Sequence, residues 1–304
     1  MKAAAVREAL RRWYKTALRA AIYVLFLPPL ELFRRLPPHA AAATGGRAGA
    51  LAAWIVRRHR LRAEANLGRA FPSLSAGERK RIVFANFRHM GRTLGEYLSL
   101  TRRDPGLLRS LVEVEGMECL SRARASGRGT VVLTAHLGSW EIAAATVALY
   151  VPKLAVVARE LYDPRLSKLI SRLRAHFNIK TIDVNDTRGI LRHLMEGGVL
   201  GVLVDQNARR VSSVPIDFFG APAPTPVGPV KIAARTGSNL IMGFIVRTER
   251  GHRLVLEEMA SRLNGTPPEL QLQRYNRRLE ELVRAHPEQW VWVHDRWGGS
   301  GASA

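Results

Sequence analysis

The sequence has one cysteine and no long uninterrupted apolar run. With Cys119 alone among 304 residues, no intrachain disulfide and no C-x-x-C pair can form. We therefore expect a reducing compartment, with Cys119 as a small buried apolar residue. The apolar residues 20–30 are too few for a confident membrane span, which needs about 20. No small-residue cleavage site follows them, so an exported signal peptide is disfavoured.

Acidic residues are scarce. The chain has 47 Lys and Arg against 25 Asp and Glu, a net charge of +22. Such a field favours an anionic partner, whether nucleic acid, an anionic membrane, a phosphorylated substrate or an acidic carrier protein. Charge alone does not choose among them, and a compositional bias toward arginine is an alternative explanation. A hydrophobic content of 47% predicts a substantial core, in one large domain or two modest ones.

Several catalytic and binding motifs are also missing. No H-E-x-x-H or comparable cluster of metal ligands is present, which argues against a zinc hydrolase. No G-x-S-x-G occurs, which argues against a serine hydrolase of the α/β-hydrolase type. Aromatic residues are not interleaved with the basic ones as a stacking platform would require, so we expect no nucleic-acid binding.

The amino-terminal residues 1–60 combine apolar helical stretches with basic flanks. "RRWYKTALRAAIYVLFLPPLELFRRLPP" and "HAAAATGGRAGALAAWIVRRHRLR" both have this pattern, and the second ends in a basic cluster at residues 57–62. Each Lys or Arg near anionic lipid is worth about 1 kcal/mol. The pattern predicts a membrane-associating helical segment, lying on the bilayer or anchored in it. The alternative is a soluble helical hairpin that packs on the main domain.

The remaining residues, 61–304, are predicted to form one domain with a helical lead-in over 61–110 and an α/β core over 111–304. Ser75 and Glu78 have the spacing of a capping box, as do Thr266 and Glu269 before a late helix. We predict strands at 130–135, 154–158, 179–184, 199–204 and 240–246, with an edge strand near 253–257. Helices are predicted at 142–150, 164–176, 187–195 and 229–235. Strands and helices in alternation predict an α/β fold with a largely parallel central sheet flanked by helices.

"VVLTAHLGSWEI" places a histidine directly after a buried strand. Open α/β sheets bind ligands at the carboxyl ends of their strands, where His136 is expected. On a continuous helix, His136 and Glu141 would point about 140° apart. Gly138 and Ser139 provide a turn, with Ser139 as a candidate N-cap, that would let the two side chains meet. A carboxylate on one ring nitrogen would make His136 a general base. The alternative is a histidine at a strand end whose hydrogen bonds are only structural.

"TAHLGSWE" resembles the H-x-x-x-x-D/E motif of the lysophospholipid acyltransferase superfamily, and specifically the branch of lipid A biosynthesis late acyltransferases. Further blocks are similar to that branch in the same order along roughly residues 60–297. They are "EANLGRAFPSLSAGERKRIVFANF", "VVARELYDPRLSKLISRLRAHFN", "VLVDQNARR", "VPIDFFGAPAPTPVGPVKIAARTG" and "HPEQWVWVHDRW".

The resemblance implies a fold like that of the glycerolipid acyltransferases and an enzyme that moves a fatty acyl chain from a thioester to a hydroxyl of a lipid acceptor. The donor would be acyl carrier protein or coenzyme A, and the acceptor a lipid A precursor or a related glycolipid or phospholipid. The resemblance implies His136 and Glu141 as the catalytic pair. The residues expected to bind substrate are Arg159, Arg172, Arg174, Asp205, Gln206, Phe218 and Phe219.

Several of these residues have a structural alternative. Asp205 and Gln206 could be a pair at a strand end whose hydrogen bonds are only structural. Phe218 and Phe219 could pack in the core instead of lining an acyl channel. Trp290, Trp292 and Trp297 are expected in the core or at a membrane interface, and His294 and Arg296 in structural hydrogen bonds.

We expect no cofactor, no metal and a monomer at the cytoplasmic face of a bacterial inner membrane, held peripherally or by one anchor. A non-catalytic protein of the same fold, or one that binds nucleic acid or another anionic surface, is the alternative.

Overall fold

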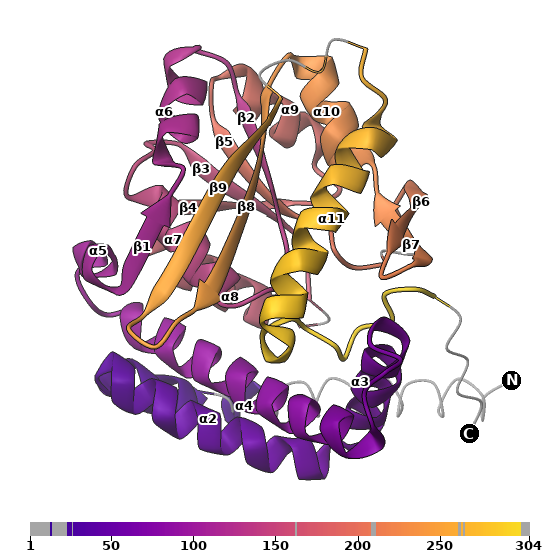
Figure 1. Cartoon of the computed structure of the whole chain (residues 1–304). Coiled ribbons are helices and arrows are strands. Elements are labelled where there is room, and N and C mark those ends of the chain that lie inside the picture. Colours follow the sequence, from indigo (N-terminus) through magenta and orange to yellow (C-terminus); the bar gives the residue numbers. More distant parts are fainter. Residues whose placement is uncertain are drawn as a thin grey trace, which may run out of the picture.

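A seven-stranded sheet forms the centre of the protein (Figure 1). The computed structural model describes residues 13, 23–25, 27–161, 163–207, 211–260, 263 and 265–298. The strand order is β1-β9-β8-β2-β5-β3-β4, and β6 and β7 form a separate hairpin. The strands are β1 (Val112–Glu115), β2 (Thr130–Thr134), β3 (Leu154–Ala158), β4 (Ile179–Asp183), β5 (Val199–Leu203), β6 (Ser213–Phe218), β7 (Ala221–Pro226), β8 (Asn239–Arg247) and β9 (His252–Ala260). From β8 to β4 neighbouring strands are parallel, whereas β9 runs antiparallel to β8 and parallel to β1. The predicted largely parallel sheet is confirmed.

Helices cover both faces of the sheet and the end where its parallel strands finish. They are α2 (Pro38–Ile55), α3 (Arg57–Ala70), α4 (Ala76–Leu100), α5 (Leu108–Leu111), α6 (Met117–Ala125), α7 (Trp140–Ala148), α8 (Pro164–Ala175), α9 (Thr187–Met195), α10 (Gly228–Thr236) and α11 (Pro268–Ala285), with short 3-10 turns at Pro105–Leu107 and Pro287–Gln289. Side chains alternate along a strand, so Val131 and Leu133 of β2 enter the core shared with α9, α10 and α11. Val132 enters the second core, shared with α6, α7 and α8.

Most predicted elements agree with the structure within two residues, but three local predictions are wrong. The strand predicted as an edge, β9, lies inside the sheet because the short strand β1 pairs alongside it. The strand β1 and the β6–β7 hairpin were not predicted. The helix α11 has Pro267 at its N-cap position and no side-chain cap, so Thr266 does not form the predicted capping box. The capping box of Ser75 and Glu78 is confirmed, as is the burial of Cys119.

The helices α2 and α4 lie side by side across the end of the sheet where the parallel strands finish (Figure 1). Their backbones approach closely because glycines face each other. An ideal Cβ on Gly91 of α4 would lie 2.1 Å from the carbonyl oxygen of Gly45 on α2, and one on Gly49 would lie 2.2 Å from that of Phe87. This packing agrees with the predicted alternative of a helical hairpin on the main domain. The predicted boundary after residue 60 falls inside α3.

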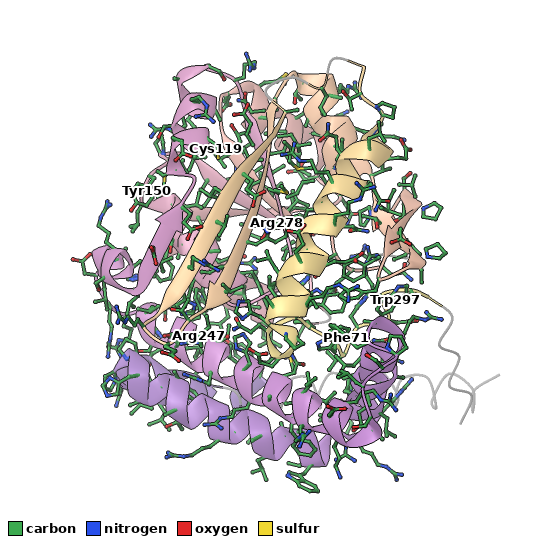
Figure 2. The ribbon with its side chains drawn as sticks, in the orientation of Figure 1. Phe71, Cys119, Tyr150, Arg247, Arg278 and Trp297 are labelled. Carbon is green, nitrogen blue, oxygen red and sulfur yellow. The ribbon has the colours of Figure 1, made fainter. Side chains whose placement is uncertain are left out.

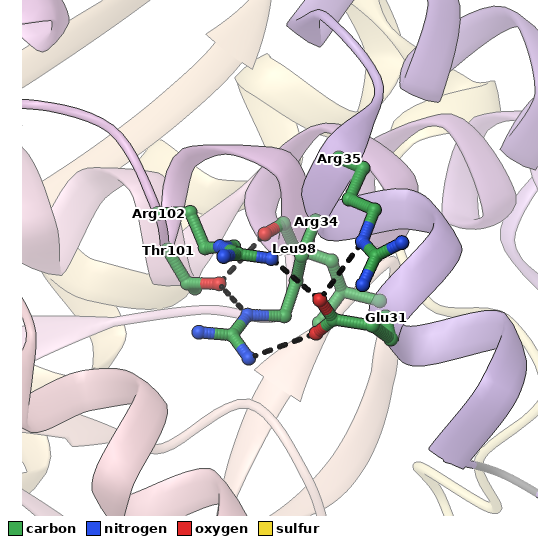
Figure 3. A network of polar contacts seen from close by, with 6 residues as sticks. All are labelled: Glu31, Arg34, Arg35, Leu98, Thr101 and Arg102. Carbon is green, nitrogen blue, oxygen red and sulfur yellow. Dashed lines mark hydrogen bonds and ion pairs between the residues drawn. The ribbon is translucent and has the colours of Figure 1, made fainter.

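The helical stretch at residues 27–35 is attached to the end of α4 by charged side chains (Figure 3). Glu31 accepts hydrogen bonds from Arg34, Arg35 and Arg102. Arg34 also donates to the Thr101 hydroxyl at 3.2 Å. Among the described residues, no helix is long and apolar enough to cross a bilayer. The predicted membrane association therefore has no support from an apolar span.

Candidate active site

His136 and Asp205 meet at the carboxyl ends of two neighbouring parallel strands. Thr134 of β2 is in register with Leu203 of β5, so the residues that follow both strands lie close together. The ring Nδ1 of His136 is 2.8 Å from Oδ1 of Asp205. The backbone N–H of His136 and the indole N–H of Trp290 each donate to Oδ2 at 2.9 Å. Three nitrogens thus converge on one buried carboxylate.

This arrangement fixes the tautomer of His136. Burial by itself would raise the pKa of Asp205, but the His136 charge and the hydrogen bonds from His136 and Trp290 outweigh it and hold the pKa below its ordinary value. An ionised carboxylate only accepts, so Nδ1 carries the hydrogen. In the neutral ring the lone pair then lies on Nε2, which bonds to no residue that the structure describes. The side chain of His136 is 20% exposed, so a substrate can reach it.

Glu141 has a different partner, and the predicted contact between His136 and Glu141 is wrong. Both oxygens of Glu141 accept from Arg174 of α8, Oε2 from Nε at 3.0 Å and Oε1 from Nη2 at 2.6 Å. Glu141 lies in the first turn of α7, where a planar guanidinium can satisfy both of its oxygens at once. Burial lowers the pKa of Arg174, but the Glu141 carboxylate outweighs it and leaves the pKa raised.

The predicted turn between the two residues is present. Gly138 has φ +59°, and an ideal Cβ there would lie 2.1 Å from the carbonyl oxygen of Ile245. Only glycine meets both conditions without strain. Ser139 occupies the N-cap position of α7, but its hydroxyl forms no capping hydrogen bond and has no partner among the described residues.

An apolar cavity of about 60 Å³ lies between α7 and the sheet. Five adjacent strands, β9, β8, β2, β5 and β3, contribute to its floor, so it extends across the strands. Its polar lining residues are Thr134, Glu141 and Arg174. Trp140 also lines the cavity, and its ring packs edge-on against that of His136 with centroids 5.0 Å apart. The cavity therefore begins beside the histidine.

The other predicted site residues are dispersed. Arg159 follows β3 and is exposed. Arg172 lies two residues from Arg174 on α8, which points it to another face, toward the groove beside the helical stretch at 27–35. Gln206 is half-buried and bonds to no described residue. The interpretation of Phe218 and Phe219 as an acyl channel is not supported, because both pack with other aromatic rings in the core and neither lines the cavity under α7.

The carboxyl-terminal segment contributes more than the sequence indicated. The backbone N–H of Gly138 donates to Gln289, and that of Val291 donates to His136. These bonds place the indole of Trp290 beside Asp205, a role that we did not predict. Trp292 and Trp297 are buried as expected. Arg296 is fully buried and donates to Pro224 and Thr225, in keeping with the predicted structural role.

A buried carboxylate, a histidine held by one ring nitrogen and an adjoining apolar cavity thus lie together, an arrangement that is chemically capable of proton transfer next to an apolar group. The chain matches the model of the bacterial lipid A biosynthesis acyltransferase family over residues 11–298 and belongs to that family.

Three relatives illustrate the range of the family. The chain is 29% identical over 276 residues to the lipid A biosynthesis palmitoleoyltransferase of Escherichia coli (strain K12), with 88% of each chain covered. It is 27% identical over 277 residues to the lipid A biosynthesis lauroyltransferase of the same strain, again with 88% of each covered. It is 24% identical over 239 residues to the phosphatidylinositol mannoside acyltransferase of Mycobacterium tuberculosis (strain CDC 1551 / Oshkosh), covering 76% of this chain and 75% of that one. The protein is an O-acyltransferase that acts on a lipid acceptor.

Proposed function

We propose that the protein transfers a fatty acyl chain from a thioester to a hydroxyl of its lipid acceptor, with His136 as the general base. The observation that carries this proposal is the His136–Asp205 contact, which leaves Nε2 available for a proton. Nε2 takes the hydroxyl proton as the oxygen attacks the thioester carbonyl. The carbon–sulfur bond then breaks, and the imidazolium returns the proton to the departing thiolate. Asp205 stabilises the imidazolium between these steps.

Glu141 has a positioning role in this proposal. Its two hydrogen bonds with Arg174 connect the start of α7 to α8 at the rim of the cavity. The pair keeps the roof of the cavity and Trp140 in place beside His136. Arg159 follows a strand of the same parallel set, so its exposed guanidinium could bind a donor phosphate or the developing oxyanion at this edge of the sheet.

The cavity under α7 is the proposed site of the acyl chain. Its lining residues come from five strands, the outer two of which lie about 19 Å apart at roughly 4.8 Å per strand spacing. A straight acyl chain has a narrow cross-section, which suits a small volume bordered by several strands. The lining is apolar except at the rim that faces His136, so the methyl end of the chain would lie away from the base. The donor is acyl carrier protein or coenzyme A; the net charge of +22 favours either polyanion.

The proposed location is the cytoplasmic face of a bacterial inner membrane. Leu51, Trp54 and Ile55 are exposed at the end of α2, immediately before Arg57 and Arg58 of α3. Exposed apolar side chains beside arginines suit a surface that inserts shallowly among anionic headgroups. Sedimentation with anionic vesicles tests this contact: the variant Trp54→Ala/Ile55→Ala should bind several-fold more weakly, and unchanged binding would contradict it.

The decisive test of the proposed chemistry compares wild type with His136→Ala and His136→Gln. Acyl transfer should fall at least about 10²–10⁴-fold in both variants, since a positioned base supplies about that factor. Circular dichroism should show that both variants remain folded. Wild-type activity in a folded His136→Ala variant would exclude the base and favour a different catalytic group.

A further inference from the structure

The helix α4 buries polar side chains on the face that it turns toward the end of the sheet. They lie three or four positions apart, in one row along the helix: Asn86, His89, Thr93 and Glu96. A helix usually buries apolar residues on such a face and turns its polar residues to water. Burial of a polar group costs free energy unless it forms hydrogen bonds, so the partners of this row show what α4 holds in place.

Two buried asparagines hold the carboxyl-terminal segment at residues 288–294. Asn86 of α4 and Asn66 of α3 each donate from the amide nitrogen to two backbone carbonyls, at 2.8 and 2.6 Å in both cases. Asn86 holds the first two and Asn66 the last two of these carbonyls, which belong to Glu288, Trp290, Trp292 and His294. The NH2 end of an amide carries two hydrogens and its oxygen none, so these contacts fix the orientation of both side chains. We call the two asparagines the amide clamp.

The same segment also pairs with the loop that carries His136. Leu137 and Trp290 form an antiparallel bridge, closed by backbone hydrogen bonds of 3.0 and 3.1 Å. The backbone of Trp290 is extended, so carbonyls of successive residues there point to opposite edges. His89 of α4 reaches the loop directly, through a hydrogen bond to the backbone of Gly138. The segment therefore lies between the amide clamp on one edge and the catalytic loop on the other.

Further contacts tie the segment to β8 and α3. Figure 2 shows Arg247 at the end of the β8–β9 hairpin, beside α4, and Phe71 at the end of α3. The side chain of Gln289 accepts from the backbone N–H of Arg247 at 2.7 Å and donates to its carbonyl at 3.0 Å. The ring of Phe71 packs edge-on against Trp292, with centroids 6.0 Å apart. Elements far apart in the sequence thus fix the segment together with the clamp.

The position of the segment determines one of the donors to Asp205. The indole N–H of Trp290 donates to Oδ2 of Asp205, the same oxygen that accepts from the backbone N–H of His136. A hydrogen bond weakens steeply as its angle departs from linear, so a small shift of Trp290 would weaken this contact. Without the amide of Asn86, the carbonyls that it holds would lack that donor, and the segment would move toward another one.

We propose that Asn66 and Asn86 are positioning residues for acyl transfer, which keep Trp290 on Asp205 and the His136 loop in its catalytic geometry. This inference rests on the proposed function, because it takes His136 as the base. It assigns a kinetic role to two side chains that act through backbone carbonyls. A purely structural pair would instead contribute stability and leave the site unchanged once the protein is folded.

The indole N–H of Trp290 tests the inference without any acyl transfer. The chain has six tryptophans, and the spectrum of Trp290→Phe identifies the indole signal of Trp290 among them. Asn86→Leu removes the amide and keeps a similar volume. In this variant the Trp290 indole hydrogen should exchange with solvent about tenfold faster than in wild type, the effect of losing roughly one hydrogen bond. An unchanged exchange rate and chemical shift in the folded variant would overturn the inference.

The matched control is Asn276→Leu. Asn276 of α11 is also fully buried, and its amide donates to a backbone carbonyl, that of Asp217, at 2.9 Å. As with Asn86, its Oδ1 has no partner among the described residues. The control should lose stability but keep both the exchange rate of the Trp290 indole and kcat. A response of the indole signal as large as that in Asn86→Leu would show general loosening and would overturn the inference.

Kinetics test whether the clamp acts through Trp290. Asn86→Leu should lower kcat about tenfold with little change in KM, because the clamp does not line the cavity under α7. The double variant Asn86→Leu/Trp290→Phe should lose little more than either single variant, since both changes remove the same contact. A loss of about a hundredfold, the product of two independent effects, would overturn the inference, as would a kcat equal to that of Asn276→Leu.

Asn66→Leu provides a second variant if Asn86→Leu does not fold. Its effects should have the same direction but be smaller, about threefold, because the carbonyls that it holds follow Trp290 in the chain. Wild-type exchange and kcat in folded Asn66→Leu would overturn its part of the proposal. The exchange measurement does not involve His136, so a faster indole exchange in an enzyme whose activity survives His136→Ala would reject the proposed base and retain the clamp.

Discussion

Two carboxylates border the active site, and their surroundings differ. Asp205 is completely buried and accepts three hydrogen bonds, two from His136 and one from Trp290. Glu141 is partly exposed, accepts two bonds from Arg174 and lines the cavity. Asp205 lies 69 positions from His136 in the chain, whereas Glu141 lies five positions away.

The difference shows that adjacency in a parallel sheet outweighs nearness in the sequence. The carboxylate that fixes the base comes from the neighbouring strand, because both strands end at the same edge. The nearer carboxylate is carried away from the ring by the first turn of a helix. We therefore expect the two acids to respond differently to substitution.

Asp205→Asn should have the largest effect. The amide has one acceptor oxygen for three donors, so one N–H group would face another and the His136 tautomer would be lost. We expect kcat to fall about 10³–10⁴-fold, the scale seen when an aspartate that orients a catalytic histidine is neutralised. Steady-state transfer assays measure this. A loss below about tenfold in a folded protein would mean that Asp205 does not orient the base.

Acid pH should destabilise the folded protein through His89, which lies next to the loop that joins β2 to α7. His89 of α4 is buried beneath it with a hydrogen bond to the backbone of Gly138, and burial lowers the pKa of His89 to about 4. The unfolded chain binds this proton near pH 6.5 but the folded chain does not. The contribution of neutral His89 to the free energy of unfolding is therefore complete above pH 6.5. It is lost as the pH falls to 4, which lowers the free energy of unfolding by about 3 kcal/mol.

Urea unfolding across that pH range measures the effect. His89→Gln cannot take up a proton, so its free energy of unfolding should show a smaller pH dependence. An identical pH dependence in the variant and the wild type would show that other groups cause the loss.

Glu141→Gln should affect stability and activity moderately. The change leaves the guanidinium of Arg174 without its carboxylate, at a cost of about 1–2 kcal/mol because both side chains are partly exposed. Activity should fall about tenfold as the start of α7 loosens. The double variant Glu141→Gln/Arg174→Gln should regain stability, as thermal unfolding would show. A loss as large as that of Asp205→Asn without any change in stability would instead indicate a chemical role for Glu141.

Trp290→Phe should have the smallest effect. Phenylalanine retains the aromatic packing but removes one donor to Asp205, at a cost of about 1 kcal/mol and roughly a tenfold loss of activity. The matched control is Trp292→Phe, whose indole N–H donates to the backbone of Pro287 instead. The control should lose similar stability with little change in kcat. Equal kinetic losses in both variants would make the role of Trp290 purely structural.

The fold was largely predictable because hydrophobic runs and helix periodicity are local. The position of His136 followed from the run "VVLTA", and Asp205 ends a similar run, "GVLVD". Their pairing depends on β2 and β5 being neighbours, which is a property of strand order and not of either segment. The predicted edge strand was wrong for the same reason, because a four-residue strand such as β1 has too weak a pattern to predict its pairing.

The direction of a side chain was less predictable than its position. Arg172 and Arg174 lie on one helix, yet only Arg174 reaches Glu141, and the choice depends on how α8 rotates against α7. Phe218 and Phe219 are equally suited by composition to a channel or a core. The core holds them because the carboxyl-terminal tryptophans pack on the same side of the sheet. Packing between distant segments decides such cases.

The glycine contacts between α2 and α4 have a consequence for the dynamics of the chain. Where Gly45 and Gly49 meet Gly91 and Phe87, backbone touches backbone, so α2 cannot rock or slide without α4. The amide hydrogens of α2 should therefore exchange with solvent deuterium as slowly as those of α4, in one cooperative unit with the helix that lies under the His136 loop. A chain that lacked α2 would leave Gly91 and Gly95 of α4 open to water.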